Sequence, residues 1–93
     1  MRHPSPDAFR DELMNADLNM TGTVVMKMLD SLQFGPPGAQ VAGAAMMMLE
    51  LSRHYGISPQ VAFEAANNMF WEQKGTLIRK QFRVIRAYVE NQL

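Results

Sequence analysis

The most constraining feature of this sequence is the run VAGAAMMML at 41–49, in which no residue carries a polar side chain. An α-helix made of such residues has no polar face, so it has to be covered on every side. A chain of 93 residues has little interior with which to cover it. The run therefore predicts either the central helix of a compact bundle or a helix within a subunit interface.

Length and composition indicate a single domain over residues 1–93, with a flexible N-terminus at 1–4, because 47% of the residues are hydrophobic. The absence of cysteine excludes disulfides, thiolate metal sites and cysteine nucleophiles. The N-terminus lacks the apolar stretch of a secretory signal, and the apolar run, even extended to Leu51, is too short to span a bilayer. We therefore expect a cytoplasmic protein that does not act at a membrane.

The charges are balanced overall but unevenly distributed along the chain. Nine basic and nine acidic residues give a formal net charge of zero, so no global field attracts nucleic acid. Residues 1–50 contain three basic and six acidic residues, a balance of −3, and residues 51–93 carry the complementary +3. This asymmetry favours self-association or a charged protein partner over uniform binding to DNA.

Capping residues and helix breakers divide the chain into about five expected helices. The expected helices begin after Ser5, Thr21, Gly38, Ser58 and Thr76. The first helix should end at about Asn15. The third should end at about Tyr55, with Gly56 as its stop, and the fourth at about Lys74, with Gly75 as its stop. No stretch alternates apolar and polar residues over the length of a strand. The sequence thus predicts an all-α fold, a compact bundle of about five short helices that is oligomeric through its apolar helices.

The residues that catalysis requires are scarce. The sequence contains two histidines, His3 and His54. His3 lies in the N-terminal segment. His54 lies near the C-terminal end of an expected helix, where the helix dipole favours such a side chain. The sequence contains no phosphate-binding loop and no zinc-ligand spacing. We therefore predict a protein that is not an enzyme and that needs neither a cofactor nor a metal.

Residues 51–63, from Leu51 to Phe63, resemble the helix-turn-helix of transcriptional regulators, with a glycine in the turn and a serine opening the second helix. In that motif the second helix enters the major groove of DNA, and here Gln60 and Asn67 would contact bases. No arginine or lysine accompanies them, and Glu64 would repel phosphate. A small DNA-binding regulator is the alternative function, and a plain helical hairpin is the simpler interpretation of the same residues.

Two groups of side chains are candidates for binding a partner. Phe63, Phe70 and Trp71 cannot all fit behind the apolar stripe of one helix, so either another helix covers them or, with Asn67, they form an exposed binding patch. The spacing of Arg79, Arg83 and Arg86 predicts one stripe on the last helix. That stripe is either a solvated face or a docking surface for an acidic protein or nucleic acid.

Residues 44–51, 55–60 and 82–91 together resemble the small helical proteins of unassigned role found in tailed bacteriophages. The resemblance implies an accessory or early viral protein that binds and modulates a host protein in the bacterial cytoplasm, and it assigns no site residues. Our leading prediction is a non-enzymatic interaction protein that self-associates and binds a host or viral protein.

Overall fold

Within residues 5–72 and 77–93, which the computed structural model describes, five α-helices form most of the fold. They are α1 (Pro6–Met14), α2 (Leu18–Leu32), α3 (Pro37–Tyr55), α4 (Pro59–Phe70) and α5 (Arg83–Gln92). A 3-10 turn, η2 (Lys80–Phe82), precedes α5, and two short strands, β1 (Trp71–Glu72) and β2 (Leu77–Ile78), pair antiparallel. The predicted helical fold is confirmed, while the small sheet was not expected.

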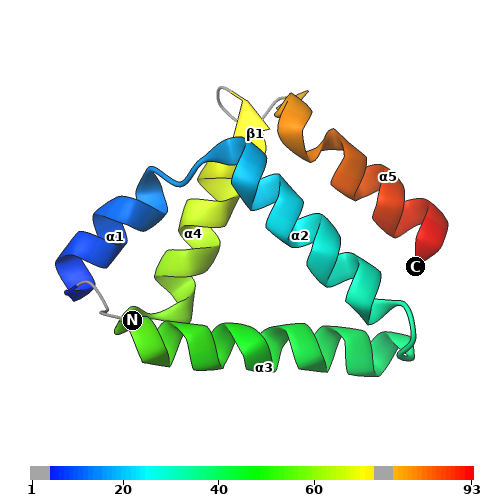
Figure 1. Cartoon of the computed structure of the whole chain (residues 1–93), viewed down its shortest axis with the longest axis horizontal. Coiled ribbons are helices and arrows are strands. Elements are labelled where there is room, and N and C mark those ends of the chain that lie inside the picture. The colour runs from blue at the N-terminus through cyan, green and yellow to red at the C-terminus, as the bar shows by residue number, and fades with distance from the viewer. Residues whose placement is uncertain (1–4, 73–76) are drawn as a thin grey trace.

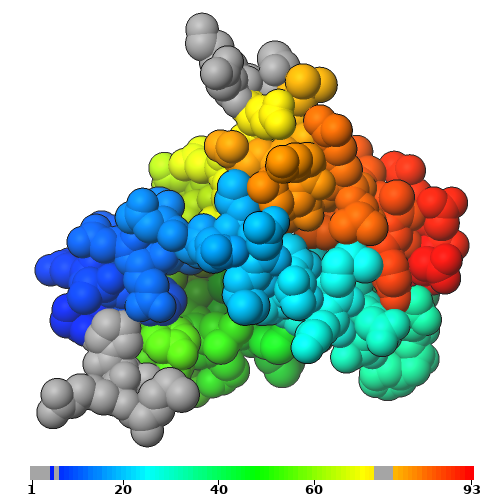
Figure 2. All heavy atoms as spheres, turned by 45° about the horizontal axis from the view of Figure 1, so that its top comes forward, coloured from blue at the N-terminus to red at the C-terminus, as the bar shows by residue number. Residues whose placement is uncertain are grey.

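The helices are arranged around a triangle. In Figure 1, α2, α3 and α4 form its three sides, α1 lies outside α4, and α5 lies outside α2. The short sheet lies at the corner where α4 ends and α2 begins, which we call the apex. Figure 2 shows the segment that enters α5 lying directly against the first half of α2, as the contacts of α2 with η2 and α5 require.

Three helices begin at a side chain that accepts a hydrogen bond from the first turn. The Ser5 hydroxyl accepts a hydrogen bond from the Ala8 amide, and the Ser58 hydroxyl accepts one from the Val61 amide, both at 3.3 Å. Both caps were predicted. The predicted start of the second helix at Thr21 is wrong, because the Asp17 carboxylate accepts from the Met20 amide at 2.8 Å and starts α2 earlier. A carboxylate is at least as good a cap as a threonine hydroxyl, and the earlier start adds a turn of helix.

The long helix α3 ends where predicted but begins before Gly38, because Pro37 and Gly38 form its first turn instead of preceding it. It begins at the Pro36–Pro37 break and ends at Tyr55, where Gly56 adopts the left-handed conformation with φ of 73°. The Ile57 amide then donates to the Ser52 carbonyl at 3.0 Å, which closes the helix end. Local chemistry at both ends is sufficient to explain these limits.

The C-terminal quarter departs from the prediction. Helix α4 ends at Phe70 instead of continuing to about Lys74, and Leu77 lies in a strand instead of beginning the last helix. The strands pair Trp71 with Ile78, and the Arg79 amide donates to the Phe70 carbonyl at 2.8 Å, so this pairing replaces the last turn of α4. The predicted helix limits at Lys74, Gly75 and Thr76, and the prediction of a flexible N-terminus at 1–4, concern residues outside the described ranges.

The buried core is small and lies near the apex. Among the described residues, Ala62, Ala65 and Phe82 are the buried hydrophobic side chains, and Phe82 is 3% exposed. The Phe82 ring stacks on Phe70 with ring centroids 6.1 Å apart. On its other side α2 approaches so closely at Gly22 that a Cβ atom there would lie 3.1 Å from the Gln81 carbonyl oxygen. In the described part of the chain, no helix is long and apolar enough to cross a membrane.

Candidate interaction surface

The chain exposes more surface than a folded monomer of its mass usually does. Its accessible area is 7055 Å², whereas the usual area for 10.5 kDa is about 5,400 Å². The excess is about 1,600 Å². The radius of gyration, 14.0 Å, likewise exceeds the value of about 12.3 Å typical of 93 residues.

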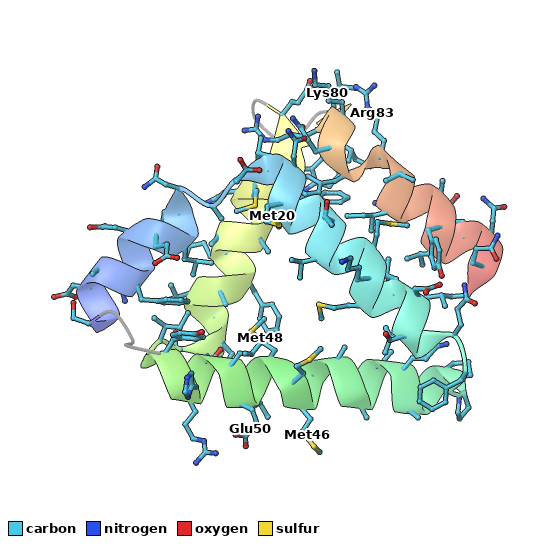
Figure 3. All side chains as sticks on the ribbon, viewed as in Figure 1. Met20, Met46, Met48, Glu50, Lys80 and Arg83 are labelled. Atoms are coloured by element: carbon cyan, nitrogen blue, oxygen red, sulfur yellow. The ribbon has the colours of Figure 1, made fainter. Side chains whose placement is uncertain are left out.

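Much of the exposed apolar area belongs to α3. Val41 is 72% exposed and Met46 is 66% exposed, so the apolar run is not covered within a single chain. Met48, in contrast, faces the inside of the triangle, while Met46 and Glu50 point away from it (Figure 3). Helix α3 is therefore not the central helix of a bundle, and its role in a subunit interface stays a prediction.

An apolar groove of 620 Å³ lies between α2, α3 and α5. Its lining includes Met28, Leu32, Val41, Ala45, Phe63 and Val89. A volume of this size is within the range of sites that bind small molecules or single large side chains. The groove offers an unoccupied apolar surface on the same side of α3 as Met48, which also lines it.

A second hollow, of 320 Å³, lies nearer the apex between α1, α2, α4 and the start of α5. Its lining is almost entirely apolar and includes Leu13, Val25, Met48, Met69, Phe70 and Phe82. Because Phe82 and Phe70 are part of the small core, we interpret this hollow as loosely filled interior.

The three aromatic residues predicted as a patch lie in different environments. Phe63 is exposed on α4 and lines the apolar groove, whereas Phe70 is half-buried against Phe82. Trp71 has left the helix for β1, where its ring meets the edge of Phe70 with centroids 5.2 Å apart. Phe70 and Trp71 contact each other, whereas Phe63 lies seven residues earlier on α4 and lines the apolar groove, so the three side chains do not form one exposed patch.

Asn67 and Trp71 remain neighbours despite the end of the helix. The Trp71 indole Nε1 donates a hydrogen bond to Asn67 Oδ1 at 3.1 Å. This bond satisfies the indole donor and occupies the amide oxygen of Asn67, one of the two groups an amide would use to pair with adenine.

The arginines also lie apart from the predicted stripe. Arg79 has an extended backbone before η2 and is half-buried, and its Nε has no hydrogen-bond partner among the described residues. Arg83 begins α5, where its Nε donates to the Ile78 carbonyl at 3.2 Å, and Arg86 is exposed one turn later. Figure 3 shows Lys80 and Arg83 projecting together from the apex. Arg79 thus lies outside the helix, whereas Arg83 and Arg86 keep the predicted spacing on α5; we call the exposed Lys80, Arg83 and Arg86 the apical cluster.

The helix-turn-helix-like segment corresponds to the end of α3, a short turn at 56–58 and α4. Gln60 and Asn67 are both exposed on α4, as a DNA-reading helix would require. Glu64 is exposed on the same helix, and α4 contains neither arginine nor lysine. The exposed surface of α4 therefore lacks the positive charge on which phosphate contacts depend.

Tyr88 connects α5 to the end of α2. Its hydroxyl donates to Asp30 Oδ1 at 3.2 Å and accepts from Gln33 Nε2. Desolvation by its neighbours and then the negative charge of Asp30 raise the pKa of Tyr88 above its ordinary value of 10.0. The bonds hold α5 beside α2 and so help to define one wall of the apolar groove.

Sequence reasoning missed Phe34, which is 95% exposed in the turn between α2 and α3. A signal for it was present in the sequence, because Phe34 directly precedes the helix-breaking segment Gly35-Pro36-Pro37-Gly38. An aromatic residue in that position belongs to neither flanking helix, so neither helix has to bury it.

The described residues contain no group of three or more histidine, aspartate or glutamate side chains placed to hold a metal ion. A comparison with protein-family models, with curated proteins and with solved structures found no match to the chain.

Proposed function

We propose that this protein is a non-enzymatic interaction protein that works as a homo-oligomer and presents its apical cluster to a protein partner. The observation that carries the proposal is the set of exposed apolar side chains on α3 and around the apolar groove, in a chain whose total accessible area exceeds the usual value. Large contiguous apolar surfaces on small proteins commonly mark sites of association.

The size of the excess supports self-association. A stable interface buries about 800 Å² on each partner, and obligate homodimers bury about 2,000–5,000 Å² in total. If two chains each covered their excess of about 1,600 Å², the interface would bury about 3,200 Å², which is within the range of obligate homodimers.

The apical cluster supports a second contact, with a protein partner. Lys80, Arg83 and Arg86 are exposed, and arginine binds carboxylates through two parallel hydrogen bonds. The half-buried Trp71, paired with Ile78 in the short sheet at the apex, adds an aromatic side chain at the same corner of the fold. The resemblance to small phage proteins extends this proposal to an acidic surface on a bacterial host protein as the target.

Sedimentation equilibrium at micromolar concentration tests self-association, and we expect a species larger than the 10.5 kDa monomer. A strict monomer would overturn this part of the proposal. For the apical cluster, the double variant Arg83→Glu with Arg86→Glu should abolish capture of the partner from a bacterial lysate. Arg10→Glu is the matched control, because this arginine is also exposed but lies on α1. Equal capture by both variants would exclude the apical cluster as the binding surface.

The alternative is a small DNA-binding regulator, favoured by one observation: a tight turn with Gly56 joins α3 to α4, whose Gln60 is exposed. We expect no sequence-specific binding to duplex DNA at physiological salt, because α4 lacks cationic side chains. A sequence-selective gel shift that weakens steeply with salt and is lost in Gln60→Ala would reverse the ranking of the two functions.

A further inference from the structure

Phe34 is an exposed aromatic side chain on a turn that is held in place. The Gln40 side-chain Nε2 donates to the carbonyls of Leu32 at 3.1 Å and Gly35 at 3.0 Å, which lie on either side of Phe34. The Gly35 amide also donates to the Leu32 carbonyl at 3.1 Å, and Pro36 fixes the backbone that follows. The turn therefore presents Phe34 to solvent in a pre-organised conformation.

Such a presentation favours binding. An aromatic side chain exposes about 150–250 Å² of mostly apolar area, and burying it needs no further ordering of a turn that is already fixed. Phe34 is 95% exposed, so it occupies no pocket of its own chain. Aromatic side chains that enter a pocket at the centre of an interface contribute a large share of binding energy.

The apolar groove provides a pocket of suitable chemistry and size. It has a volume of 620 Å³, and its lining is apolar except for Gln40. Leu32 and Gln40 belong both to the groove and to the bonds that hold the Phe34 turn, so the turn that carries the exposed ring lies next to the groove. Two copies related by a two-fold axis can therefore make the same contact twice.

We propose that Phe34 of each chain inserts into the apolar groove of a second copy, so that two such contacts form the centre of a homodimer. This inference rests on the self-association in the proposed function and specifies the surface responsible. A second copy is the favoured occupant because the turn that carries Phe34 adjoins the groove on the same chain, so one two-fold axis can pair both contacts. The accessible area of about 1,600 Å² beyond the usual value is also sufficient for a stable homodimer.

The test compares the dimer dissociation constant of three variants by sedimentation equilibrium. Phe34→Ala removes the inserted ring and should raise the dissociation constant by at least about 30-fold, as loss of a central aromatic contact does. Ala45→Trp fills the groove from an exposed position and should have a similar effect. Met20→Ala is the matched control, because Met20 is 63% exposed but lies on the first turn of α2, outside the groove. It should leave the dissociation constant within about 3-fold of the original.

A site-specific photo-cross-linker, p-benzoylphenylalanine, at position 34 retains an aromatic ring and locates the contact directly. We expect cross-links between copies to groove residues such as Met28 and Val41. Far-UV circular dichroism should show unchanged helical content in Phe34→Ala, because the ring packs against nothing in its own chain.

The outcomes separate the two proposals. If the original chain dimerises and Phe34→Ala dimerises equally well, Phe34 is not inserted in the groove, while self-association stands. If the original chain is a monomer, both fail. If it is a monomer whose capture of another protein depends on Phe34, the second copy is wrong as the occupant of the groove.

Discussion

Replacing Gly22 by alanine measures how closely the apex is packed. The added Cβ atom would lie 3.1 Å from the Gln81 carbonyl oxygen and 3.7 Å from the Phe82 ring. The first distance is tighter than nine in ten contacts of real Cβ atoms, so the Gln81 carbonyl has to shift by a few tenths of an ångström. Such overpacking costs about 1–3 kcal/mol, whereas glycine to alanine in a helix contributes about 1 kcal/mol of stability. We expect Gly22→Ala to lower stability by about 1 kcal/mol.

Gly43→Ala is the matched control for this prediction. Gly43 lies in the interior of α3, and a Cβ atom there meets nothing within 4 Å. This variant should gain about 1 kcal/mol from helix propensity alone. Because propensity is common to both substitutions, the difference between the variants isolates the cost of overpacking at the apex.

Thermal unfolding followed by circular dichroism provides the assay, at one protein concentration because association shifts the midpoint. For a domain of this size, about 1 kcal/mol corresponds to about 4–8 °C. Gly22→Ala should therefore melt about 10 °C below Gly43→Ala. Midpoints within about 2 °C of each other would show that η2 yields freely and that the close approach does not constrain the apex.

Three further predictions concern the core, one helix cap and one tyrosine. Phe82→Ala should lower the free energy of unfolding, measured in urea, by about 3–5 kcal/mol, because Phe82 is 3% exposed. Phe63→Ala is the control and should change this free energy far less, because Phe63 is exposed. Asp17→Ala should lower helical content and cost about 1 kcal/mol, since it removes the cap of α2, and an unchanged melting curve would contradict that role. In a variant that retains only this tyrosine, phenolate absorbance should place the pKa of Tyr88 above 10.0, and Asp30→Asn should lower that pKa. Because the folded chain holds this proton more tightly, the stabilisation is complete below a pH of about 10 and disappears as pH rises through the raised pKa.

Some parts of the candidate surface could be predicted from the sequence, and others could not. The exposed side chains of Phe63 and Arg86 were predicted as candidates for partner binding, and both are exposed. Their grouping was wrong, because it assumed one continuous helix through Trp71 and another through Arg79. Trp71 and Ile78 instead pair with each other on two short antiparallel strands. This pairing joins residues seven apart in the chain and replaces the predicted helix there, and the local sequence pattern did not indicate it.

The sequence by itself determined the helices that start and stop through local chemistry. Ser5 and Ser58 cap their helices, and Gly56 ends α3, because each of these interactions involves residues at most five apart in the chain. Only the tertiary structure decided which apolar surfaces are buried. The composition of the run at 41–49 does not reveal whether the run is covered or exposed. It is exposed because the helices are arranged around a triangle, so that α3 has neighbouring helices on one side alone. Burial depends on where distant segments meet, so the groove and the small core at Phe82 were fixed by long-range packing.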